Sequence, residues 1–233
     1  ADPDAAKSTA KAVVSEDKSP SEILKTAKFF TLWTCFFIGA GAGLMVIGSA
    51  KGLAKASMGE MAFLVVAIMS VGNAAGRIVA GVVSDKIGRA NTLVIMLVFQ
   101  ATLMFLAIPV IDGTYSNPLA MPLLVTFMVF NYGTNLSLFP SFAKDFWGAK
   151  HFGMNYGILF SAWGVGAFAL VRVSEMLRVK TGGFTMSFAA AGALLVVGAM
   201  LAGTLKTRKA EVPVLEGAFE EEEDLVLSKA TNE

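Results

Sequence analysis

The chain has 233 residues, of which 55% are hydrophobic and 16% charged, and its mean hydropathy is +0.64. A soluble domain carries roughly a quarter of charged residues, so a water-soluble fold and a nucleic-acid-binding protein are both excluded. The formal net charge of +1 identifies no partner, and the single cysteine, Cys35, excludes an internal disulfide and a cysteine-based zinc site. We expect an all-α membrane protein without a metal or other cofactor.

Residues 1–28 are polar and are expected to form a central cytoplasmic loop. Within them, Ser19-Pro20-Ser21-Glu22 has the pattern of a helix N-cap, a proline at the first helical position and an acid at the third. This pattern predicts a short helix over 22–28 that runs into the first membrane span. Because the chain lacks an initiator Met and begins like a linker, we interpret it as a piece of a longer protein.

A helix needs about 20 apolar residues to cross the hydrocarbon core of a membrane. Six segments reach this length, separated by charges or helix breakers: 29–50, 61–84, 91–111, 120–143, 154–177 and 184–205. Together they form the predicted six-helix transmembrane bundle, 29–205. Residues 206–233 contain the acidic run Glu220–Asp224 and are expected to be a disordered acidic cytoplasmic tail.

An even number of spans places both termini on one side of the membrane. Lys and Arg are enriched in cytoplasmic loops, and most of those near span ends fall on the terminal side. The positive-inside rule therefore predicts cytoplasmic termini in a multi-pass protein of the cell (inner) membrane. The terminal side carries Lys11, Lys18, Lys25, Lys28, Lys86, Arg89, Lys144, Lys150, Lys206, Arg208 and Lys209, and the opposite side carries Lys51, Lys55, Arg178 and Lys180.

Two arginines lie within spans, where a charge is costly and is a functional candidate. Arg77 is one helical turn after Asn73, so both side chains project from the same face of the second span. A guanidinium binds a carboxylate through two parallel hydrogen bonds, so Arg77 is a candidate anion anchor. The alternatives are neutralisation by an acid of another helix, or snorkelling to the interface. For Arg172, near the outer end of the fifth span, an ion pair with Glu175, three residues later, or snorkelling to the interface is a sufficient explanation.

Aromatic residues of the fifth span form a second candidate feature. Tyr156, Phe160 and Trp163 share one helix face at positions i, i+4 and i+7. This aromatic face suits the apolar tail of a substrate, and packing between helices is the alternative. In the unusually polar fourth span, Tyr132 is the candidate for a hydroxyl in the same pocket.

The segment Gly81–Arg89 has the form G-x-x-x-D-K-x-G-R between the second and third spans. Gly81 and Gly88 permit close helix approach and a tight turn. Asp85 can accept hydrogen bonds from a helix N-terminus, while Lys86 and Arg89 are expected to stay at the membrane interface. Its charge alone would be explained by an ordinary positive-inside loop. The spacing of its residues, and its place between two spans, make it a more specific signal than charge alone.

This spacing resembles the signature loop of the major facilitator superfamily. The resemblance implies that the chain is one half of a major facilitator fold, helices seven to twelve, with Gly81–Arg89 as a gating motif and an N-terminal six-helix half as partner. Within the superfamily, the chain is similar to the oxalate/formate antiporter branch, close to bacterial monocarboxylate transporters. That similarity lies in Thr26, Lys28-Phe29-Phe30, Leu32-Trp33, Phe139-Pro140, Asp145-Phe146-Trp147-Gly148, Lys150, Gly153 and Asn155-Tyr156-Gly157.

The resemblance implies that Arg77 binds a substrate carboxylate. Proton-coupled relatives carry an acid where this chain has Asn73, and oxalate carriers of the branch carry a Lys where it has Trp163. A dianion would need two cations in a low-dielectric cavity, and this half offers one clear cation. We therefore expect the substrate to be a monocarboxylate.

We expect a secondary active transporter of small organic anions, such as lactate, pyruvate or formate. It would work by alternating access, with a proton as coupling partner. Exchange of oxalate/formate-type carboxylates is the alternative mode, and a non-transporting receptor or assembly subunit is the alternative class. An enzyme is not expected, because the sequence has neither H-E-x-x-H nor G-x-S-x-G, and its single histidine, His151, lacks a partner acid at catalytic spacing.

Overall fold

The computed structural model describes residues 17–58 and 62–205, with side chains described outside 50–62. The acidic tail predicted at 206–233, and most of the central loop predicted at 1–28, lie outside the described residues. Their boundaries therefore stay predictions.

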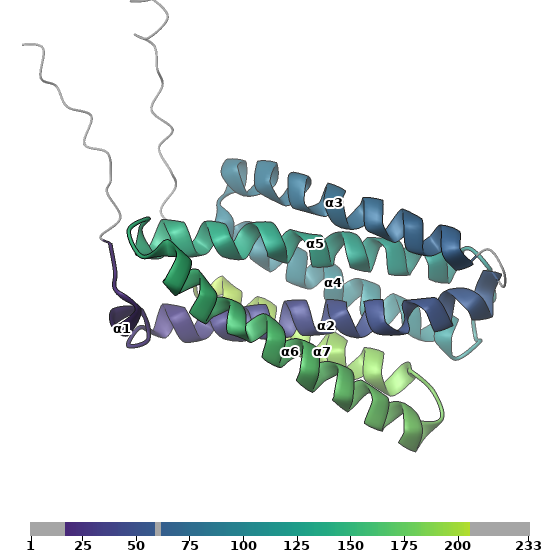
Figure 1. The fold of residues 1–233 in the computed structure, drawn as a ribbon. Helices are drawn as coiled ribbons and strands as arrows, with labels where there is room; N and C mark the ends of the chain where they lie inside the picture. Colours follow the sequence, from purple (N-terminus) through teal and green to yellow (C-terminus); the bar gives the residue numbers. More distant parts are fainter. Residues whose placement is uncertain (1–16, 59–61, 206–233) are drawn as a thin grey trace, which may run out of the picture. The chain divides into compact units, whose positions relative to one another are not determined.

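Within the described residues the chain is helical, without a strand, and its long helices follow the predicted spans (Figure 1). The predicted all-α fold is confirmed. The helices are α1 (Pro20–Ile23), α2 (Ala27–Met58), α3 (Ala62–Ile87), α4 (Arg89–Ile111), α5 (Ala120–Trp147), α6 (Phe152–Thr181) and α7 (Thr185–Gly203).

Five of the described long helices are long and apolar enough to cross a membrane, namely α2, α3, α4, α6 and α7. The sixth, α5, has ample length at 28 residues, but its middle is polar. Asn131, Tyr132, Thr134 and Asn135 lie there, and all four are buried in the bundle. The low hydropathy of α5 therefore reflects side chains that face protein rather than lipid.

The short first helix differs from its prediction. It covers Pro20–Ile23 and does not run into α2, which begins at Ala27. The hydroxyl and the backbone N–H of Ser19 donate to the Glu22 carboxylate at 2.6 Å and 2.7 Å, and these two hydrogen bonds lower the pKa of Glu22. Thr26 then interrupts the helix, because its hydroxyl donates to the Ile23 carbonyl at 2.7 Å and accepts from the Phe29 N–H at 3.3 Å.

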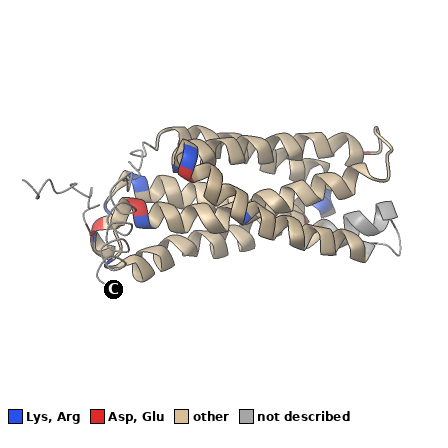
Figure 2. Ribbon diagram, turned by 90° about the horizontal axis from the view of Figure 1, so that it is seen from above, with Lys and Arg blue, Asp and Glu red and all other residues tan. Residues whose placement is uncertain are grey.

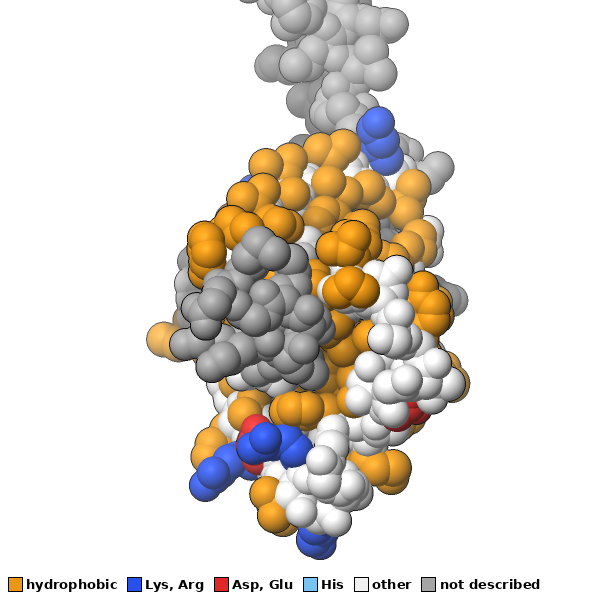
Figure 3. Space-filling model, turned by 90° about the vertical axis from the view of Figure 1, so that its right-hand side faces the viewer, with side chains coloured by type: hydrophobic (Ala, Val, Ile, Leu, Met, Phe, Trp, Pro, Cys, Tyr) orange, Lys and Arg blue, Asp and Glu red, His pale blue; other side chains and the backbone are white. Residues whose placement is uncertain are grey.

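Helix α2 is the most buried of the five spans and packs against α5, α6 and α7. The most extensive contacts join α3 to α5, α2 to α6 and α4 to α7. Charged residues gather toward the helix ends (Figure 2), and apolar side chains cover much of the face seen in Figure 3. On α3, Phe63, Val71 and Ile78 are among the large exposed hydrophobic residues. An apolar exterior of this kind suits a membrane, because lipid tails are its solvent.

The contact between α3 and α5 depends on two glycines. A methyl group added at Gly76 would overlap the carbonyl oxygen of Phe130, and one added at Gly133 would overlap that of Asn73. Small residues at such crossings let two backbones approach closely. This contact fixes the helix that carries Arg77 against the helix that carries Tyr132.

We expect Gly76→Ala to destabilise the bundle by about 1–3 kcal/mol, because the rigid Phe130 backbone cannot give way as a side chain would. The measurement is the melting temperature of the purified protein in detergent. Gly81→Ala is the matched control on the same helix, since a methyl there meets the Ser137 hydroxyl at an ordinary 3.7 Å. Equal melting temperatures for the two variants would contradict the close crossing.

Candidate functional site

A groove of about 640 Å³ opens between α2, α3 and α5 and contains Arg77 and Asn73. Among the described residues that line it, Arg77 alone carries a charge. The other lining residues are Ile47, Val66, Met69, Ser70, Ala74, Ile78 and Val129. A single cation on a largely apolar wall is a favourable setting for one small anion.

The Arg77 side chain is held by its own helix. Its Nε–H donates to Asn73 Oδ1 at 3.2 Å, across one helical turn. In the part of the chain that the structure describes, Arg77 forms no ion pair, so neutralisation by an acid of another helix is not observed. Because Asn73 engages Nε, the two terminal nitrogens of the guanidinium can still accommodate a carboxylate.

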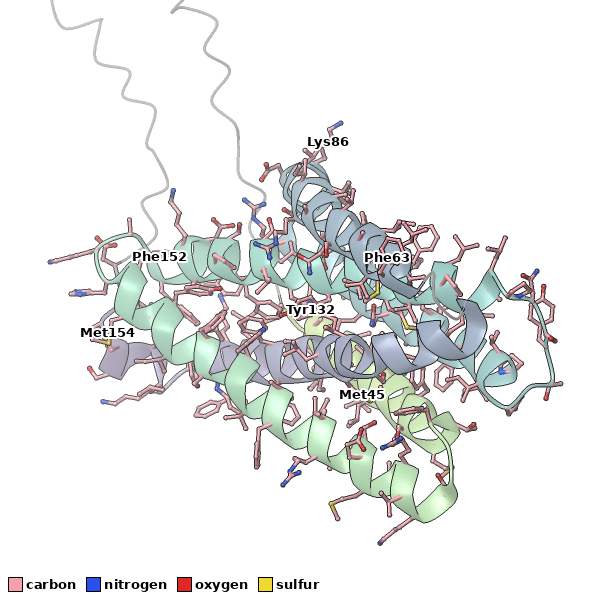
Figure 4. The ribbon with its side chains drawn as sticks, turned by 45° about the vertical axis from the view of Figure 1, so that its right-hand side comes forward. Met45, Phe63, Lys86, Tyr132, Phe152 and Met154 are labelled. Atoms are coloured by element: carbon pink, nitrogen blue, oxygen red, sulfur yellow. The ribbon has the colours of Figure 1, made fainter. Side chains whose placement is uncertain are left out.

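Tyr132 joins α5 to α6. The indole N–H of Trp163 donates to the Tyr132 hydroxyl at 2.8 Å. The Tyr132 ring packs against Gly43 of α2 and projects from α5 toward that helix (Figure 4). The structure therefore joins two predicted site residues from two helices, Tyr132 and Trp163, whereas Arg77 pairs with Asn73 on α3.

The predicted aromatic face exists as a row of ring contacts. Tyr156 lies 5.6 Å from Phe160, and Phe160 stacks on Trp163 at 5.3 Å, both measured between ring centroids. Phe160 also meets Phe36 of α2 edge-on at 5.7 Å, so part of this face packs between helices. Neither these three residues nor Tyr132 is among the residues that line the groove around Arg77.

Sequence reasoning missed the aromatic residues of α2 that face this row. Trp33 donates its indole N–H to the Ser161 hydroxyl at 3.0 Å, and Phe36 stacks on Phe139 at 4.1 Å. The signal was present, because Trp33, Phe36 and Phe37 fall at i, i+3 and i+4 on one helix.

The Gly81–Arg89 segment is mostly helix, because α3 continues to Ile87 and α4 begins at Arg89. Gly88 alone separates them, with φ of +90°, a conformation that needs glycine. The predicted tight turn is therefore confirmed at this residue. At Gly81 the nearest contact of an added methyl group is 3.7 Å away, so packing does not require glycine there.

Arg89 pairs with acids of two helices, a feature that the sequence pattern did not predict. Its guanidinium forms ion pairs with Asp85 at 2.6 Å and with Asp145 of α5 at 3.2 Å, and it also donates to the Ser84 hydroxyl. These contacts hold the ends of α3, α4 and α5 together. Lys86 is exposed and points away from the bundle (Figure 4).

At the opposite end, the ion pair between Arg172 and Glu175, one of the two expected explanations for Arg172, is not observed among the described residues. Glu175 pairs with Arg178 at 3.0 Å, three residues later instead of three residues earlier. The Arg178 guanidinium also lies over the Phe184 ring, 5.3 Å from its centroid, and this contact favours the observed rotamer. Arg172 lines a separate hollow with Met176 and Lys180, away from the groove.

A bundle of membrane-length helices with one arginine in an open groove has the architecture of a membrane transport protein. The sequence matches the Major Facilitator Superfamily over residues 27–230, and the chain belongs to that family. The helical bundle agrees with one half of a transporter of this family.

Two relatives confirm the resemblance to the oxalate/formate branch. The chain is 30% identical over 167 residues to the uncharacterized MFS-type transporter YhjX of Escherichia coli (strain K12). The matched region covers 68% of this chain and 39% of that relative. It is 31% identical over 153 residues to the oxalate:formate antiporter of Oxalobacter formigenes, which covers 64% of this chain and 36% of that protein. The matched region thus spans about two fifths of each relative's length.

Proposed function

We propose that this chain is the half of a secondary transporter that comprises helices seven to twelve, and that the complete protein moves small organic anions. Arg77 binds the substrate carboxylate, and an N-terminal six-helix half completes the cavity. The two halves then expose this cavity to either side of the membrane in turn, by alternating access. The observation that carries the proposal is an exposed arginine in a groove, without an ion pair among the described residues. Both termini then lie in the cytoplasm, at the cell (inner) membrane.

The charge of the groove favours a monocarboxylate such as lactate, pyruvate or formate. One guanidinium balances one carboxylate, whereas a dianion would keep an unpaired charge in a low-dielectric cavity. Arg172 lines a different hollow and offers no second cation to the groove. Trp163 donates its indole N–H to Tyr132 and, unlike a lysine at the same position, carries no charge.

In this proposal the Gly81–Arg89 segment acts as a gate that fixes the cytoplasmic ends of three helices. Arg89 supports this role, because it joins Asp85 of α3 to Asp145 of α5. Proton symport is the coupling mode we favour for a monocarboxylate. Anion exchange is a second candidate, favoured by the relative named oxalate:formate antiporter.

Counterflow uptake by the complete transporter in proteoliposomes tests the substrate class. We expect labelled lactate or formate to enter in exchange for the unlabelled anion, and oxalate to enter at least tenfold more slowly, because it needs a second cation. A pH gradient that drives net uptake would support proton symport, and strict dependence on an internal anion would support exchange. Faster oxalate uptake contradicts the monocarboxylate assignment, and zero flux of every carboxylate would favour a receptor or assembly subunit.

A further inference from the structure

The turn between α5 and α6 holds a short stretch of chain from the start of the described region. The N–H of Lys18 donates to the Trp147 carbonyl at 3.0 Å, and the Lys18 carbonyl accepts from the Asn155 side-chain amide at 2.8 Å. Asp17 accepts the Lys150 N–H at 3.0 Å through its carboxylate. Both backbone groups of Lys18 are therefore satisfied by groups at the end of α5 and the start of α6.

The hydrogen-bond donor for this stretch is a buried side chain of α6. Asn155 is fully buried, and in the described structure its amide nitrogen is committed to the Lys18 carbonyl while its Oδ1 has no partner. A buried amide is costly without a hydrogen-bond partner, so loss of the contact with Lys18 would leave the Asn155 side chain without any partner among the described residues. Gly148 has φ of +78°, and a side chain there would overlap Asp17.

The stretch is also anchored from its other side. Ser19 bonds directly to Glu22, so residues 17–19 lead straight into α1, and the α1 residue Ile23 is fully buried. Phe29 at the start of α2 lies 6.0 Å from the Trp147 ring, between centroids. Figure 1 shows α1 at the same end of the bundle as the α5–α6 turn. The three residues thus join the start of the first span to the start of α6.

We propose that residues 17–19 form a strap that holds the start of α6 against the end of α5, and so positions the aromatic face beside Tyr132. Asn155 is the positioning residue, directly before Tyr156 and two turns before Trp163. The closed strap is a property of the fold and does not depend on what the protein transports. The positioning role predicts an effect on transport turnover, and this part rests on the proposed function.

Hydrogen–deuterium exchange of the complete transporter tests the strap. We expect the amides of Lys18 and Lys150 to exchange at least tenfold more slowly in the wild type than in Asn155→Ala and Asp17→Ala. Lys25→Ala is the control, because this exposed side chain lies outside the strap contacts. Asp17→Ala keeps the test valid if the Asn155 variant misfolds. Equally fast exchange of these amides in wild type and variants overturns the strap.

Transport kinetics test the positioning role. We expect the two strap variants to lower turnover severalfold and to leave the substrate KM unchanged, since Arg77 remains in place. Unchanged turnover in variants whose strap has opened overturns positioning. Absence of carboxylate flux in the wild type would instead refute the proposed function, and the exchange measurement would still decide whether the strap is closed.

Discussion

Replacing Arg77 with alanine in the complete transporter is expected to lower carboxylate uptake by more than tenfold at substrate concentrations near the wild-type KM. Arg77 is the one charged residue among the described lining of the groove. Loss of a charge-assisted, two-point contact costs about 2–3 kcal/mol in a site partly open to water, which is roughly a 30- to 140-fold loss of affinity. Counterflow uptake measures the loss of transport, and substrate-induced thermal stabilisation measures the loss of affinity.

Two further variants make this result specific. Arg77→Lys keeps the charge and loses the planar fork, so an intermediate loss of affinity is expected. Arg172→Ala removes an exposed arginine from a hollow outside the groove and should leave uptake unchanged. If Arg172→Ala abolished uptake and Arg77→Ala did not, the carboxylate site would have to be moved to α6.

The substitution Asn73→Asp is expected to make anion binding depend on pH. Asn73 Oδ1 already accepts the Arg77 Nε–H at 3.2 Å, so an aspartate at this position would form an ion pair with the guanidinium. At neutral pH we expect the affinity for the substrate to fall by about tenfold or more, because the anion then competes with an internal carboxylate. Protonation of the aspartate at low pH should restore binding.

Asn73→Ala separates the loss of the hydrogen bond from the gain of charge. This variant should weaken binding slightly at every pH, since Arg77 remains unpaired but less well held. Isothermal titration of the complete transporter between pH 7 and pH 5 would give both profiles. A flat profile for Asn73→Asp would mean that the two side chains do not share the groove.

The helices were predictable because each span is a run of about 20 or more mostly apolar residues, and such a run is sufficient for a helix to cross the membrane. Their ends were less predictable. Helix α2 continues to Met58, past the predicted end at 50, because no proline follows the apolar run and Gly52 is a single glycine among alanine, leucine and lysine, which favour helix. The predicted gap of six residues between the second and third spans is a single residue in the structure, Gly88, because glycine readily adopts the positive φ that the turn requires.

The candidate site was predictable where its contacts are local. Arg77 and Asn73 are one turn apart, so helix periodicity placed them on one face. The ion pair between Arg89 and Asp145 joins residues 56 positions apart, and nothing in the local pattern indicates it. The bond between Trp163 and Tyr132 is similar, because both residues were candidates but only the packing of α6 on the bundle joins them.

The polar middle of α5 has a consequence for how the protein is made. The Asn135 amide donates to carbonyls of its own helix, but the Asn131 amide would lose water without gaining a partner if α5 entered lipid by itself. The Asn131 amide finds its partner in the Met96 carbonyl of α4, which is synthesised earlier. We therefore expect α5 to enter the membrane together with α4, which supplies this partner.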